Sequence, residues 1–202
     1  MYLPDAFRQD DREALLGLAA THPFATVVTH GAGGLSVSHL PLCVDAARNV
    51  LRGHLARANP QLEQLADGAE VLAVFHGPHG YVSPSVYVDQ PSVPTWNYVV
   101  VHAHGHARRV DEKGLRSILD EALSRFDATG WSLYTGDEFL RPMLDAIAGF
   151  EIDLDRVEGK WKLSQNRSPD DRARVAAWLE RGDDSSRALA ALMRAQEEAE
   201  EP

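Results

Sequence analysis

The sequence is poor in cysteine, in long apolar runs and in positive charge. Cys43 is the only cysteine among 202 residues, which excludes an intrachain disulfide and cysteine-rich zinc sites. It lies in the apolar run 40–44, so we expect a buried, unreactive thiol. No apolar run approaches the ~18 residues that a membrane span needs, and the first residues lack the layout of a signal peptide. We therefore expect a cytoplasmic protein without a membrane segment.

The charge balance argues against a nucleic-acid-binding module. The sequence contains 20 lysines and arginines and 30 aspartates and glutamates, which gives a formal net charge of −10. Such a field repels a phosphate backbone unless basic residues gather on one face. The best basic clusters, 108–116 and 167–174, are interleaved with acids, and no helix-turn-helix pattern is evident. Strong direct DNA binding is therefore not expected.

The sequence has enough apolar residues for an ordinary hydrophobic core and for several strands. Hydrophobic residues make up 44% and charged residues 25%, values near those of globular proteins. Apolar or alternating patterns predict six strands, at 24–30, 35–45, 50–56, 69–77, 96–110 and 149–157. The continuous apolar run 69–77 predicts burial on both faces, and the alternation in 149–157 predicts a half-exposed strand. The four prolines of 77–95 predict a loop or an edge segment.

Helical patterns surround these strands. They predict helices near 10–22, 59–67, 111–128 and 136–148, and a helical tail over 170–199. Sequential strands with short turns favour an antiparallel barrel or sandwich. We predict one mainly β, α+β domain over 1–202, with a barrel and helical insertions in 1–168 and a helical C-terminal extension in 169–202.

Histidines are concentrated on one predicted strand. His102, His104 and His106 alternate with small residues, so all three imidazoles share a face at about 7 Å spacing. Two or three of them could bind one zinc or iron ion. No HExxH motif and no evident carboxylate partner accompanies them, so an ordinary polar strand face is favoured. A haem- or metal-handling protein stays open as an alternative.

The segment GHLARANP, at 53–60, joins a strand to a predicted helix start. The free amide groups of a helix start favour an anion, and His54, Arg57 and Asn59 lie beside it. They would suit a phosphate group. No P-loop or GxGxxG motif is present. From this segment alone, a capping asparagine and a solvated arginine are the simpler interpretation.

Two tryptophans stand among polar residues. Trp96 precedes Asn97, and Trp161 is followed by Lys162 and Gln165. These groups would line a flat aromatic ligand that carries hydrogen-bonding edges and a negative charge. Buried tryptophan is more often part of a core, but the segment KWKLSQN is too polar for an ordinary core strand.

Taken in order, these segments resemble a known family. The resemblance rests on MYLPDAF, SHLPL, GHLARANP, FHGPHGYVSPSVY, VPTWNYVVVHAHG and GFEIDLDRVEGKWKLSQNRS, at residues 1–7, 38–42, 53–60, 75–87, 93–105 and 149–168. The family is that of the PaiB-like FMN-binding negative transcriptional regulators. It implies a six-stranded antiparallel split β-barrel with peripheral helices, and a homodimer with FMN near the subunit interface.

The resemblance also implies the site. It implies phosphate and ribityl contacts at Ser38, His39, His54, Ala56, Arg57 and Asn59. It implies contacts with the flavin ring system at Trp96, Asn97, Lys162 and Gln165, some of them from the second subunit. His102 and Gly105 match the family's VHxxG pattern, whereas His104 and His106 are particular to this sequence. No catalytic residue and no metal ligand is assigned.

Three functions follow as hypotheses. The first is an FMN-binding regulator that acts through its flavin or a small-molecule ligand rather than through strong DNA contacts. The second is an FMN-dependent oxidoreductase of the flavin-reductase or pyridoxamine-phosphate-oxidase type, in which the flavin supplies the chemistry. The third is the haem- or metal-handling protein of the histidine strand.

Overall fold

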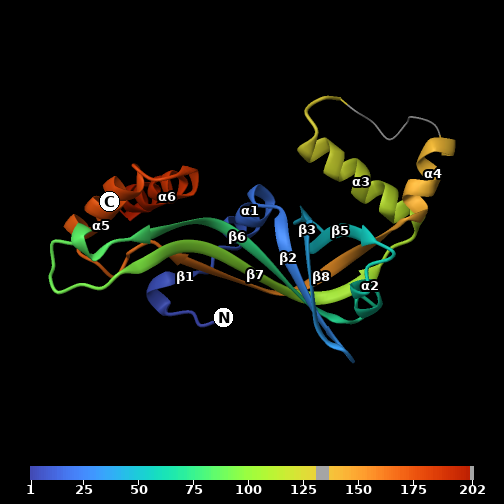
Figure 1. Cartoon of the computed structure of the whole chain (residues 1–202), viewed down its shortest axis with the longest axis horizontal. Helices are drawn as coiled ribbons and strands as arrows, with labels where there is room; N and C mark the ends of the chain where they lie inside the picture. The colour runs from blue at the N-terminus through green and yellow to red at the C-terminus, as the bar shows by residue number, and fades with distance from the viewer. Residues whose placement is uncertain (131–136, 201–202) are drawn as a thin grey trace. The chain divides into compact units, whose positions relative to one another are not determined.

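The computed structural model describes residues 1–130 and 137–200 of the chain (Figure 1). The chain divides into two compact units. Unit 1 comprises residues 1–11, 76–101 and 158–202, and unit 2 comprises residues 12–75 and 102–157. Each unit is therefore assembled from segments far apart in the sequence, and three long strands contribute residues to both. The prediction of one domain over 1–202 stays a prediction.

The described residues form a sheet of eight strands in the order β3-β2-β6-β7-β8-β5-β4, with β1 paired to β8. The strands are β1 (Arg8–Gln9), β2 (Phe24–Gly31), β3 (Gly34–Pro41), β4 (Cys43–Asp45), β5 (Val50–Ala56), β6 (Glu70–Val82), β7 (Thr95–Arg109) and β8 (Ile147–Lys162). The mainly β class is confirmed. The count exceeds the predicted six because the predicted strand 35–45 is interrupted at Leu42 and because β1 has only two residues, too few to show a pattern.

Six α-helices and two short 3₁₀ turns are seen in the described part of the chain. They are η1 (Asp5–Phe7), α1 (Arg12–Thr21), α2 (Gln61–Gln64), η2 (Pro84–Val86), α3 (Glu112–Phe126), α4 (Asp137–Asp145), α5 (Pro169–Leu179) and α6 (Asp184–Glu200). Asp111 caps α3 by accepting a hydrogen bond from the Gly114 amide at 2.8 Å. The predicted C-terminal helical tail is two helices, and the Gly182 amide bonds the Leu179 carbonyl at their junction. None of the described helices is long and apolar enough to cross a membrane.

In unit 2, close strand packing fixes the sheet. The hairpin of β2 and β3 pairs Val28 with Val37, and β5 pairs with β8 from Val50 through Ala56. Gly105 on β7 faces the backbone of β8, where an added Cβ would lie 2.1 Å from the Asp153 carbonyl oxygen. Any side chain at that position would force the backbone apart.

Two predictions about strand faces are wrong. The run 69–77 is not buried on both faces, because Leu72 and Val74 alternate with buried neighbours and are only half-buried. Conversely, Glu151 in the half-exposed strand is buried, with 2% of its surface accessible. In addition, the first residues of the predicted loop 77–95 belong to a strand, because β6 continues to Val82.

Candidate functional site

A polar cluster joins the end of β3 to the turn after β5. The Asn59 side-chain amide donates to the Ser38 hydroxyl at 2.9 Å. The Asn59 side-chain oxygen accepts from the Gln61 amide at 2.9 Å. One asparagine therefore closes its own turn and ties it to a strand 21 residues earlier. Ser38 and Asn59, both predicted site residues, are thus in direct contact.

Ala56 is the last residue of β5, Arg57 begins the turn that follows it, and both are exposed. The Arg57 backbone amide donates to the Ala146 carbonyl at 2.9 Å, which anchors the turn. Its guanidinium forms no ion pair with any residue in the described part of the chain. An exposed guanidinium without a carboxylate partner is well suited to an anionic ligand. Because α2 has only four residues, the predicted helix-terminus contribution is small, and side chains must supply the charge.

The sequence analysis missed the residue that holds this turn in place. Gln61 is buried, and its amide nitrogen lies 3.1 Å from the Val27 carbonyl and 3.1 Å from the Thr29 hydroxyl. It also lies 3.2 Å from the Ser36 carbonyl. The signal was weak, because a glutamine in the first turn of a helix is unremarkable. On β3, exposed His39 places its Nδ1 3.1 Å from the Thr26 hydroxyl.

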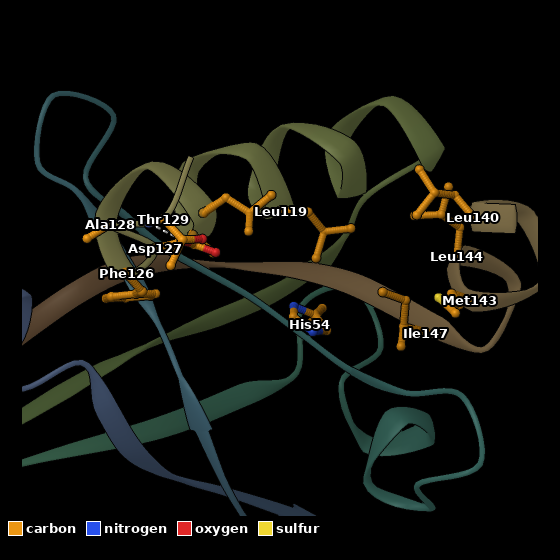
Figure 2. A pocket seen from close by; sticks show the side chains of 12 residues that line it. His54, Leu119, Phe126, Asp127, Ala128, Thr129, Leu140, Met143, Leu144 and Ile147 are labelled. Carbon is orange, nitrogen blue, oxygen red and sulfur yellow. Dashed lines mark hydrogen bonds between the residues drawn. The ribbon is translucent and has the colours of Figure 1, made fainter. Parts of the chain in front are cut away.

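His54 lies in a different environment from this cluster. It lines a pocket of about 710 Å³ between β5, α3 and α4, shown in Figure 2. The lining residues are His54, Leu119, Ala122, Leu123, Phe126, Asp127, Ala128, Thr129, Leu140, Met143, Leu144 and Ile147. Burial in these apolar surroundings lowers the pKa of His54, so the imidazole is neutral at physiological pH.

The predicted ring-system contacts all lie in unit 1. Trp96 is 54% exposed, and its ring lies 5.9 Å from that of Tyr81 and 6.1 Å from that of His79. Asn97, next in sequence, is buried, and its amide donates to the Ser164 hydroxyl at 2.8 Å. Of these two neighbours, Trp96 is the one presented to solvent.

Lys162 and Gln165 are engaged within the same unit. The Lys162 ammonium donates to the Trp96 carbonyl at 2.7 Å and contacts the Thr95 hydroxyl. Burial, with the nearby charges of Lys160 and Arg167, lowers the pKa of Lys162. The Gln165 side chain accepts from the Leu163 amide at 2.8 Å and donates to the Trp161 carbonyl at 2.6 Å. Its polar groups therefore stabilise a local turn.

The histidine strand has the predicted alternation. His102, His104 and His106 alternate with the buried residues Ala103 and Gly105. The rings of His102 and His104 lie 6.4 Å apart. His106 Nδ1 lies 2.7 Å from a carboxylate oxygen of Asp155 on β8, a partner that the sequence analysis did not identify. The only sign of this carboxylate partner in the sequence was the alternation of acidic residues in 149–157.

His104 and His106 also contribute to a second pocket in unit 2. It has a volume of about 530 Å³ and an apolar part formed by Val28, Leu35 and Leu72. The residues around it are Val28, Thr29, His30, Leu35, Glu70, Val71, Leu72, His104, Gly105, His106, Asp155 and Arg156. These side chains come from β2, β3, β6, β7 and β8, so the pocket lies on the half-buried face of the sheet.

Comparison with known families defines the class of protein to which this geometry belongs. The family described as "Putative FMN-binding domain" matches residues 1–156. That range contains the Ser38–Asn59 cluster, both pockets of unit 2 and the histidine strand. The chain belongs to this FMN-binding family, so the predicted family, its function class and its FMN cofactor are confirmed.

A curated relative extends the match. The chain is similar to the protease synthase and sporulation protein PAI 2 of Bacillus subtilis, with 31% identity over 200 residues and 96% of each chain covered. This relative is a PaiB protein, which agrees with the predicted resemblance.

Solved structures agree with the predicted fold. The flavocytochrome Anf3 of Azotobacter vinelandii matches with a TM-score of 0.64 at 14% identity, over 83% of this chain and 75% of that one. An FAD and heme binding protein of Mycobacterium smegmatis matches with a TM-score of 0.61 at 21% identity, over 82% and 78%. These likenesses show the fold alone and confirm the flavin split-barrel class.

Proposed function

We propose that this protein is a homodimeric FMN-binding regulator that holds the FMN phosphate at the polar cluster of Ser38, Arg57 and Asn59. The observation that carries the proposal is the 2.9 Å hydrogen bond between Asn59 and Ser38, beside the exposed guanidinium of Arg57. It joins two segments of the family's region into one patch of hydrogen-bond donors.

The donors present fit a phosphate. The Ser38 hydroxyl accepts from Asn59, which leaves its own proton for a ligand, and the Asn59 amide has a second hydrogen. Arg57 adds a permanent positive charge and can bind two oxygens at once. His39 and Ala56 border the same segments, and we propose that they contact the ribityl chain. When bound, FMN supplies electron or hydride transfer.

The proposed dimer is supported by the outer face of the hairpin. β3 is at one end of the strand order, and its side chains Leu35 and Val37 are 72% and 54% exposed. His39, on the same face, is also exposed. Apolar side chains on an edge strand are typical of an interface. We propose that exposed Trp96, with Asn97, Lys162 and Gln165 behind it, forms the wall against the flavin ring, partly from the partner subunit.

Regulation through the flavin or a ligand is favoured over strong operator contacts by the net charge of −10. The FMN-dependent oxidoreductase is the alternative, because the same bound flavin would serve it. The metal- or haem-handling hypothesis stays a second alternative, because the rings of His102 and His104 lie 6.4 Å apart on one strand, although His106 pairs with Asp155. The cytoplasmic location stays a prediction.

The test compares FMN with riboflavin, which lacks the phosphate, by the quenching of flavin fluorescence. Arg57→Ala should weaken FMN binding by about 1.5–3 kcal/mol, roughly 10- to 150-fold, because a charge-assisted hydrogen bond is lost. Riboflavin binding should stay unchanged. Arg174→Ala, which removes an exposed arginine of α5, is the matched control and should bind both flavins as the wild type does. Equal losses for both flavins, or no loss, would reject the phosphate site.

A further inference from the structure

We propose that the pocket between β5, α3 and α4 is a second ligand site, which takes a neutral, mostly apolar ring compound carrying one hydrogen-bonding group for His54. The pocket measures about 710 Å³, within the range of sites for drug-sized molecules. All of its lining residues belong to unit 2. Figure 2 shows His54 between the side chain of Leu119 on one side and that of Ile147 on the other.

His54 gives the pocket its one central polar group. Among the described residues, its imidazole nitrogens have no hydrogen-bond partner, and the lining that it shares is mostly apolar, with the side chains of Leu119, Leu144 and Ile147. A polar group surrounded by apolar side chains costs free energy unless it is hydrogen-bonded. A neutral imidazole can both donate and accept, so a carbonyl or hydroxyl group of a ligand would satisfy it.

The charges around the pocket select against an acid. Asp127 is the one charged residue among the described residues of the lining. Its carboxylate accepts hydrogen bonds from the Thr129 amide at 2.6 Å and the Thr129 hydroxyl at 2.5 Å. These bonds lower the pKa of Asp127, so it is ionised at neutral pH. Because the described lining residues supply one fixed negative charge and no cation, a fatty acid or a phosphate would be repelled.

The same argument separates this pocket from the FMN site. Neither Ser38 nor Arg57 nor Asn59 lines it, and the lining residues that the structure describes offer no positive charge for the FMN phosphate. Phe126 and Met143 are 48% and 51% exposed, although they line the pocket. An apolar ligand would cover part of that surface, which supplies a driving force independent of flavin.

The experiment uses the full-length, FMN-loaded protein and prodan, a neutral naphthalene dye with one carbonyl group, detected by its blue-shifted emission. Ala122 lines the pocket, whereas Ser124 on the same helix is exposed and outside the lining. Ala122→Trp should fill the pocket and weaken prodan binding at least about tenfold. Ser124→Trp should bind prodan as the wild type does. Circular dichroism and FMN titration check that both variants are folded.

A second variant tests the hydrogen bond and does not depend on the tolerance of a large side chain. His54→Leu should weaken prodan binding about fivefold, the effect of one lost hydrogen bond. It should leave the binding of naphthalene, which has no polar group, unchanged or tighter. Absence of saturable prodan binding, equal binding by Ala122→Trp and wild type, or equal loss of both probes in His54→Leu would overturn the proposal. Prodan binding that is seen in FMN-free protein and lost on loading with FMN would overturn it too, by assigning the pocket to the flavin.

Discussion

Arg52 and His54 are two residues apart on β5 and face the same side of the strand, toward α3, which packs against β5 (Figure 1). Arg52 is fully engaged. Its guanidinium contacts Glu151 at 3.1 Å, Glu121 at 2.6 Å and Ser117 at 3.1 Å. His54 has no such partner within the described residues and faces an apolar pocket.

This difference separates a side chain that stabilises the fold from one that is available for binding. Buried charges persist when they are paired, and Glu151 meets this condition with Arg48 at 2.8 and 2.9 Å, with Arg52 and with Arg108. A polar group that lines an apolar pocket without a partner among the described residues is a candidate for a ligand contact. Removal of the ion pairs of Arg52 should therefore destabilise the fold, whereas replacement of His54 should affect ligand binding more than stability.

The largest effect is expected at the centre of the ion-pair network. Glu151→Ala should lower the free energy of unfolding by about 3 kcal/mol, because it removes the carboxylate shared by three arginines and leaves buried Arg52 with Glu121 as its remaining carboxylate partner. Chemical denaturation followed by circular dichroism measures the change. Asp153→Ala, on the same strand but exposed, is the control and should cost less than about 1 kcal/mol. Equal effects at both positions would contradict the distinction.

A smaller effect is expected in acid. Burial alone raises the pKa of Glu151, but the hydrogen bonds and charges of Arg48, Arg108 and Arg52 outweigh it and lower the pKa below its ordinary value of 4.5. A lowered carboxyl pKa means that its stabilisation is complete above pH 4.5 and is lost as the pH falls through the folded-state pKa. The difference in unfolding free energy between wild type and Glu151→Gln should therefore narrow from pH 7 to pH 3. A constant difference would show that Glu151 does not titrate with unfolding.

The smallest effect is expected at His54. Burial lowers its pKa below the ordinary 6.5, so the unfolded chain binds a proton more readily than the folded chain. Stability is then complete above pH 6.5 and falls as the pH decreases toward the folded-state pKa. His54→Leu should change the unfolding free energy at pH 7.5 by less than about 1.5 kcal/mol. It should also reduce the loss of stability between pH 7.5 and pH 5. An unchanged pH profile would show that His54 is already solvated.

Where local pattern decides structure, prediction from the sequence worked well. The strands at 24–30 and 50–56 and the helix at 111–128 were placed within one or two residues of β2, β5 and α3. Prediction from the sequence failed where the pairing of strands decides how far a strand extends. Pro78 suggested a loop, yet β6 continues through it. The pairing of β2 with β6 ends at Val74. Beyond that residue, β2 accepts no hydrogen bond from a backbone amide of β6, so a proline, which has no amide hydrogen, is tolerated there.

The site divides in the same way. The family resemblance implied a phosphate site near Arg57, which stays a prediction, and the structure brings two of its residues, Asn59 and Ser38, into contact. The motif GHLARANP gave no reason to separate His54 from Arg57, although His54 faces the apolar pocket. Strand alternation states which residues share a face, but it does not state what covers that face.

The sequence by itself determined the family, the order of strands and helices along the chain and the residue types available for an anion. The strands and helices follow from turns, alternation and helical spacing, which are local properties, whereas the family follows from the resemblance of the motifs to those of a known family. The tertiary structure alone decided that Glu151 is buried among three arginines, that Asp155 pairs with His106 and that His54 has no hydrogen-bond partner within the part of the chain that the structure describes. Each of these results depends on which strand lies beside which and on what packs above them, and contacts between residues so far apart in the chain leave no periodic trace in the sequence.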